Sequence, residues 1–181
     1  RSDPAAVWRS ISDSERTALT SILVDDFESG TNRTTLPDSS SWYMVGGAER
    51  VAAGAGRSGT ALHFDATTTE NVIFAAALLA ATPRNLGSVD SIVLWARGRG
   101  RLRTGMEHAR AGLQIVAWSG IGLDTTWRRI SIPPSAFDLS EGAPWSAVRD
   151  SATHLSFALE GEGEVWIDDP RIYGIDRTDL R

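Results

Sequence analysis

The sequence predicts an all-β fold in which antiparallel strands pack as a β-sandwich. From residue 21 onward apolar and polar residues alternate with a period of two, and glycine, serine and asparagine interrupt these runs at short intervals. No segment carries a convincing helical pattern, and about ten short strands in this arrangement are typical of a sandwich or barrel. The 41% apolar fraction and the seven tryptophans can supply the core of one domain of 181 residues.

The first twenty residues differ from the rest of the chain. Asp3-Pro4 resembles a helix N-cap followed by the first helical position, and short turns fit the residues after it. We therefore expect a linker with short helical turns over 1–20, the sandwich over 21–176 and a tail over 177–181.

The expected strands follow one another through the sandwich segment. They are 21–27, 41–45, 60–66, 71–78, 91–97, 101–106, 113–118, 127–132, 154–160 and 165–172. We interpret Gly98-Arg99-Gly100 as a hairpin turn between two of them. The alternating glutamates and glycines of 160–164 are interpreted as a solvated acidic loop.

Alternation within these strands predicts one sheet with an apolar inner face and an outer face suited to sugars. Aromatic rings stack on the C–H faces of sugars, and planar polar groups bond to hydroxyl pairs. The candidates on this outer face are Trp95, Trp118, Arg97, Arg103 and Gln114, and Trp42, Tyr43 and Trp145 are candidates for its rim. The alternative is that the tryptophans pack under loops.

Charge and motif content exclude several function classes. A net charge of −5 disfavours nucleic acid and anionic membranes as partners, and the absence of cysteine excludes disulfides and thiol catalysis. The longest apolar run, 72–81, is about half the length of a membrane span. The three histidines have no metal-binding spacing, and no nucleophile elbow, phosphate loop or dinucleotide motif is present.

Carboxylates near the two ends of the sandwich predict a metal site. If the first and last strands lie side by side, Asp25, Glu28 and Asp169 come close together, and like charges repel unless a cation lies between them. An all-oxygen cluster suits calcium. The alternative is that these acids are capping or solvated residues.

Several motifs in order resemble the galactose-binding-like jelly-roll superfamily, and within it family 11 carbohydrate-binding modules. The resemblance covers about residues 22–174, and the motifs that carry it are 24–30 (VDDFESG), 56–64 (GRSGTALHF), 91–98 (SIVLWARG), 127–133 (WRRISIP) with Phe137, and 165–174 (VWIDDPRIYG). It implies a structural calcium held by the carbonyl of Asp25, by Glu28, by carbonyls around 57–60 and by Asp168 or Asp169. Asp169 is preferred because it shares its strand parity with Val165 and Ile167.

The resemblance also implies a glucan-binding trough rich in tyrosine, from which this chain departs. It has two tyrosines, Tyr43 and Tyr173, so tryptophan is expected to supply the stacking. Trp127 and Trp166 match positions that are structural in the family.

These observations predict a non-catalytic carbohydrate-binding module that recognises a β-glucan-type polysaccharide and carries a structural calcium ion. The expected protein is a monomeric accessory module of a secreted or cell-surface bacterial enzyme. A jelly-roll domain for structural or protein interactions, without a sugar site, is the alternative. A polysaccharide lyase or hydrolase, built around Arg103, His108 and Glu160, is a minor one.

Overall fold

A computed structural model describes residues 21–36, 40–45, 51–52, 56–66, 72–77 and 85–175. The linker expected over 1–20 and the tail expected over 177–181 lie outside the described residues. Within the described part of the chain, no helix is long and apolar enough to cross a membrane.

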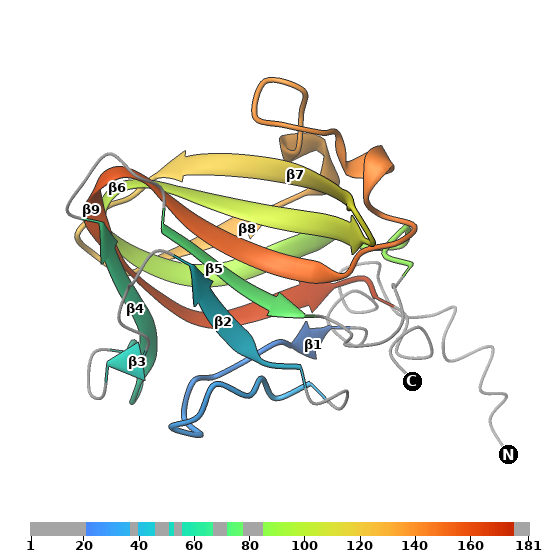
Figure 1. The fold of residues 1–181 in the computed structure, drawn as a ribbon. Helices are drawn as coiled ribbons and strands as arrows, with labels where there is room; N and C mark the ends of the chain where they lie inside the picture. The colour runs from blue at the N-terminus through green and yellow to red at the C-terminus, as the bar shows by residue number, and fades with distance from the viewer. Residues whose placement is uncertain are drawn as a thin grey trace, which may run out of the picture.

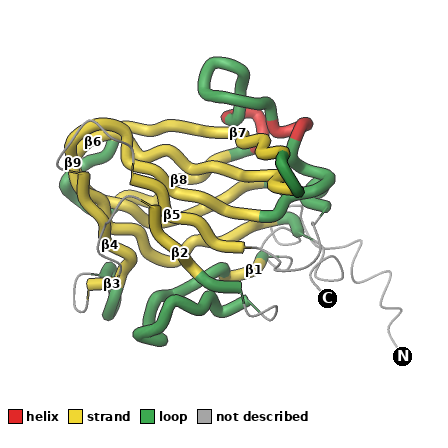
Figure 2. Tube along the Cα trace, in the orientation of Figure 1, coloured by secondary structure: helices red, strands yellow, loops and turns green. Residues whose placement is uncertain are grey.

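The described chain is built from antiparallel strands, as predicted. The strands are β1 (Ile22–Leu23), β2 (Trp42–Val45), β3 (Val51–Ala52), β4 (Ala61–Ala66), β5 (Val72–Ala77), β6 (Ser91–Arg110), β7 (Leu113–Gly122), β8 (Arg128–Ile132) and β9 (His154–Tyr173). Two single 3-10 turns, η1 (Pro134–Ala136) and η2 (Trp145–Ala147), lie between β8 and β9. Figure 2 shows them close together at one end of the sandwich.

Two long strands, β6 and β9, run through both layers of the sandwich. They pair with each other from Ser91↔Tyr173 to Glu107↔His154, and Figure 1 shows β9 crossing one layer, turning at the edge and returning through the other. The second half of β6 pairs with β7 and its first half with β8. We call the layer β2-β5-β9-β6-β7 the β7 sheet, and the layer containing β3, β4, β1 and β8 the β8 sheet.

The predicted hairpin turn at Gly98-Arg99-Gly100 and the predicted loop at 160–164 are therefore wrong, because both segments are strand. Two glycines let β6 and β9 bend at this point while their backbones stay in contact. A Cβ at Gly98 would overlap the carbonyl oxygen of Glu164, and a Cβ at Gly163 would overlap that of Arg99. The bend carries each strand from one sheet to the other while the even-numbered residues of β6 stay inside.

The hydrophobic core fills the space between the sheets. Leu94, Leu102 and Met106 of β6 are fully buried there, as are Phe64 of β4 and Phe157 of β9. The odd-numbered side chains of β6 therefore face outward from the β8 sheet in its first half and from the β7 sheet in its second.

Candidate functional site

The outer face of the β7 sheet gathers aromatic and polar side chains from four strands. Tyr43 of β2 meets His154 of β9 edge-on, with ring centroids 6.0 Å apart. Tyr43 is 46% exposed. It is therefore an aromatic surface open to solvent.

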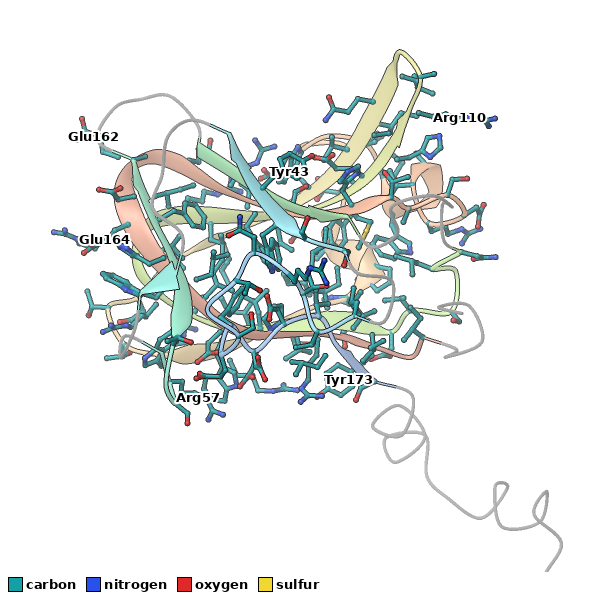
Figure 3. The ribbon with its side chains drawn as sticks, turned by 60° about the horizontal axis from the view of Figure 1, so that its bottom comes forward. Tyr43, Arg57, Arg110, Glu162, Glu164 and Tyr173 are labelled. Atoms are coloured by element: carbon teal, nitrogen blue, oxygen red, sulfur yellow. The ribbon has the colours of Figure 1, made fainter. Side chains whose placement is uncertain are left out.

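A hollow of about 570 Å³ lies on this face at the β6–β7 turn. Its lining is Tyr43, Glu107, Ala109, Arg110, Ala111, Gly112, Leu113, Gln114 and His154. In Figure 3, Tyr43 lies over the sheet and Arg110 lies at the end of β6. Exposed Leu113 adds apolar surface beside the polar groups.

Glu107 of β6 forms the floor of the hollow. The residue is only 4% exposed. Its Oε1 accepts a hydrogen bond from Ser156 Oγ at 2.9 Å, and its Oε2 accepts one from Gln114 Nε2 at 3.4 Å. Nδ1 of His154 lies 4.0 Å from Oε2. Burial and the negative charge of Glu107 together raise the pKa of Tyr43.

Trp118 of β7 lies flat on the neighbouring strand because the residue opposite it is a glycine. A Cβ at Gly105 would lie 2.6 Å from Cζ3 of the indole. The guanidinium carbon of Arg103 lies over the ring, 4.7 Å from its centroid. The segment before η2 covers the edge of the ring, where a Cβ at Gly142 would lie 3.2 Å from Cδ1. Trp118 therefore supports Arg103 rather than presenting a free ring.

Glu141, in the same segment, fixes two arginines of the face. Arg101 donates hydrogen bonds to Glu141 and to Glu160, the latter at 2.6 Å. Arg103 donates from Nη2 to the carbonyl oxygen of Glu141 at 2.8 Å. Hydrogen bonding and the positive charge of Arg101 lower the pKa of Glu141. These pairs hold the guanidinium of Arg103 at one orientation on the sheet.

The structure thus brings four predicted site residues to one face, namely Tyr43, Arg103, Gln114 and Trp118. Trp95 and Arg97 lie on the outer face of the β8 sheet instead, so the prediction of one shared face is wrong. Its cause is the bend in β6, which turns the outward side chains of the two halves in opposite directions.

On the β8 sheet, the aromatic faces are occupied by neighbouring side chains. His63 stacks on Trp166 at 4.4 Å, and the guanidinium carbon of Arg97 lies 4.5 Å from the Trp166 centroid and 5.3 Å from that of Trp127. Arg57 covers Trp95 at 4.3 Å. These contacts run across the strands and stabilise the sheet.

Trp42, predicted at the rim of the site, is a core residue. It is 6% exposed and packs against Phe27 and Phe157. Its Nε1 donates to Asp25 Oδ2 at 2.6 Å. It shares β2 with Tyr43, and the alternation of the strand points the two side chains in opposite directions. Trp145 is likewise buried, against Phe137.

Two of the predicted metal residues, Asp25 and Asp169, contact other side chains, although the first and last strands pair as expected. The carboxylate of Asp25 accepts from Trp42 and from the backbone N–H of Phe27, and burial raises its pKa to about 6. Asp169 has a left-handed backbone (φ 49°) and lies 3.7 Å from Nη2 of Arg57. The described residues include no cluster of three acidic or histidine side chains that could hold a metal.

The alternation argument for Asp169 is wrong because β9 contains a bulge there. Val93 and Trp95 of β6 pair with Arg171 and Asp168, so β9 has one extra residue in this interval. The extra residue turns Asp169 outward and leaves Asp168 buried, at 2% exposure.

An oxygen-rich arrangement remains around the 57–60 loop. Asp168 Oδ2 accepts from the backbone N–H of Arg57, and Glu28 Oε1 accepts from that of Thr60, each at 2.8 Å. A Cβ at Gly59 would overlap the carboxylate of Glu28. Two carboxylates therefore contact one short loop, and carboxylate and carbonyl oxygens are the ligands that calcium uses.

The fold matches solved carbohydrate-binding modules. The family 11 module of the Clostridium thermocellum cellulase Lic26A-Cel5E superposes with a TM-score of 0.62 at 17% identity, over 86% of this chain and 95% of that one. A family 30 module gives 0.63 at 15% identity over 89% and 91%, and a point variant of the family 29 module CBM29-2 gives 0.56 at 12% identity over 90% of each chain. The chain has the jelly-roll fold of these modules. No protein-family model and no curated protein sequence matches it.

From the sequence, Glu107 is expected in a loop where it could contact a ligand, and His154 is not identified as a member of the site; the structure places both on strands of this face. Glu107 has the same parity as Arg101 and Arg103, but the expected strand ended at residue 106. Segment 154–160 is strand, as predicted. Leu155 is buried, so alternation points the adjacent side chain of His154 to the outer face. Extending the expected strand 101–106 by one residue, and applying alternation to the expected strand 154–160, would have found both residues.

Proposed function

We propose that this protein is a non-catalytic carbohydrate-binding module whose site is the outer face of the β7 sheet, centred on the hollow. The observation that carries the proposal is the exposed ring of Tyr43 beside a hollow lined by Glu107 and Gln114. An aromatic ring next to fixed acceptors and amide groups suits a sugar unit, which presents C–H groups and hydroxyls together.

We further propose a β-glucan-type polysaccharide as the ligand. A solved family 11 module with this fold (TM-score 0.61, 18% identity) is in complex with a β-1,3-1,4-mixed-linked tetrasaccharide. The face continues from the hollow to Arg103, so a chain of several sugars can lie along it. Attachment to a secreted bacterial enzyme and a monomeric state complete the proposal.

The alternative of an interaction domain without a sugar site is favoured by the covered tryptophans. Arg57 lies over Trp95, and Arg103 lies over Trp118. Tyr43 supports the sugar site because its ring is partly open to solvent. The binding experiment below separates the two functions.

Affinity electrophoresis against β-glucans, glucomannan, xylan and pectin tests the proposal. We expect one or two β-glucans to retard the wild-type protein, and Tyr43→Ala to weaken this binding about tenfold because stacking is lost. Trp95→Ala, on the other sheet, is the matched aromatic control and should bind as the wild type does. Failure of every polysaccharide to retard the protein would support the interaction domain instead.

We also propose that a calcium ion stabilises the loop 57–60. Glu28, Asp168 and the carbonyl oxygen of Asp25 would hold it, with further oxygens from the loop and water, because calcium takes about six to eight oxygen ligands. In this role the ion crosslinks the first strand, the loop and β9. It does not contact the sugar face.

Thermal unfolding with calcium and with a chelator tests this site. At calcium about 100-fold above its dissociation constant, stabilisation of about 2.7 kcal/mol is expected, which corresponds to a melting temperature roughly 5–10 °C higher. Glu28→Gln should remove the calcium-dependent part of the shift. Superimposable melts of the wild type in calcium and in chelator would disprove the site.

A further inference from the structure

Glu107 differs from the other carboxylates on the outer face of the β7 sheet. Glu141 and Glu160 are both ion-paired with Arg101. No arginine in the described part of the chain forms an ion pair with Glu107. Its hydrogen-bond donors are the neutral hydroxyl of Ser156 and the neutral amide of Gln114. The hollow therefore has a buried carboxylate at its floor to which no described arginine is paired.

The basic side chains that face Glu107 compensate this charge weakly. His154 Nδ1 lies 4.0 Å away and contacts the hydroxyl of Thr153 at 2.8 Å. Arg110 also lines the hollow, but it is exposed at the end of β6, where water and salt screen its charge. A buried carboxylate whose charge is only weakly compensated is costly, and a cation entering the hollow would relieve that cost.

The groups around the carboxylate match the needs of an ammonium group. An ammonium has three donors and no acceptor. Glu107 offers carboxylate oxygens, and Gln114, whose amide nitrogen points to Glu107, also carries an amide oxygen. The ring of Tyr43 attracts a cation over its face. Burial, together with the same negative charge acting across the hollow, raises the pKa of Tyr43.

We infer that the hollow selects a sugar unit bearing a protonated amino group, such as a glucosamine residue in a β-1,4-linked chain. This inference rests on the proposed function, because it uses the same site. A hydroxyl in the same position would donate a hydrogen bond to the Glu107 carboxylate but would leave its negative charge uncancelled, whereas an ammonium makes the hydrogen bond and adds the opposite charge of an ion pair. A uronic acid would meet the carboxylate as a like charge and be rejected.

The test compares two hexasaccharides that differ at one position of each sugar. The β-1,4-glucosamine hexamer carries an amino group at C2 where cellohexaose carries a hydroxyl. In mildly acidic buffer, calorimetry should show the glucosamine hexamer binding about tenfold more tightly than cellohexaose. The N-acetylated hexamer, which is neutral, should lack this advantage, and so should the free amine in mildly alkaline buffer.

A variant assigns the preference to Glu107. Glu107→Gln should bind both hexamers with similar affinity, because it keeps the side-chain shape and removes the charge. Glu162→Gln removes the same charge at the bend of the sandwich. Glu162 lies on the opposite side of Figure 3 from Arg110, which lines the hollow, so this variant should keep the preference.

The outcomes separate this inference from the proposed function. If cellohexaose binds as tightly as the glucosamine hexamer, or if a galacturonate hexamer binds more tightly, the inference is wrong and the sugar site stands. If no hexamer binds, the proposed function itself fails. The comparison of ligands on the wild-type protein remains decisive even if Glu107→Gln does not fold.

Discussion

Trp42→Ala is expected to lower the free energy of unfolding by about 3–5 kcal/mol, which is the usual cost of removing a buried tryptophan. The indole fills the space between Phe27 and Phe157, with ring centroids 5.8 and 5.6 Å away. Its removal leaves a cavity and also takes a hydrogen bond from the buried carboxylate of Asp25. Urea unfolding followed by circular dichroism measures the change.

Two neighbouring variants separate the contributions. Trp42→Phe keeps an aromatic ring and removes the indole N–H, so it should cost roughly 1–3 kcal/mol, the penalty of an unsatisfied buried acceptor. Tyr43→Ala changes the adjacent residue on the outer face and should leave stability nearly unchanged. A Trp42→Ala protein as stable as the wild type would show that Trp42 lies outside the core, at the rim where its sequence position suggested.

The all-β class and most strand positions could be predicted because alternation is a local property. Segment 60–66 illustrates this: Leu62 and Phe64 are buried, while His63 and Asp65 are more exposed. Such a pattern follows from one residue to the next and needs no knowledge of the rest of the chain. Segment 51–52, the short strand β3, carries no such pattern and was not predicted.

The continuity of β6 and β9 could not be predicted from local patterns. Gly98-Arg99-Gly100 has the composition of a hairpin turn, and glycines also permit two strands to bend in contact. The choice depends on the partner strand, since Gly98 lies against Glu164, far away in the sequence. This bend decides which sheet each residue belongs to. Predicting a hairpin turn in its place therefore put Trp95 and Trp118 on one face.

Part of the candidate site was predictable because alternation is a local property of each strand. Arg103, Gln114 and Trp118 belong to strands whose alternation was identified correctly, so their shared face followed. The contacts of a tryptophan ring depend on residues that are distant in the sequence. Trp118 is covered by Arg103 because Gly105 lies opposite and Glu141 holds the arginine, and neither partner is adjacent in the sequence.

Gly163→Ala is expected to destabilise the protein by about 1–3 kcal/mol, the usual range for forcing extra atoms into a packed site. The new Cβ would overlap the carbonyl oxygen of Arg99, which is backbone and cannot turn aside as a flexible side chain can. Relief of the overlap requires β6 and β9 to separate at the bend. The midpoint of urea unfolding reports the loss.

Gly122→Ala provides the matched control for this substitution. Gly122 also lies in a strand, has no left-handed backbone angle, and has nothing within 4 Å of the added Cβ. Its replacement should change stability by no more than about 0.5 kcal/mol. Equal stability of the two variants would mean that β6 and β9 do not touch at residue 163. The segment would then be the solvated loop that its glutamates and glycines indicate, and the two halves of each long strand would be separate strands.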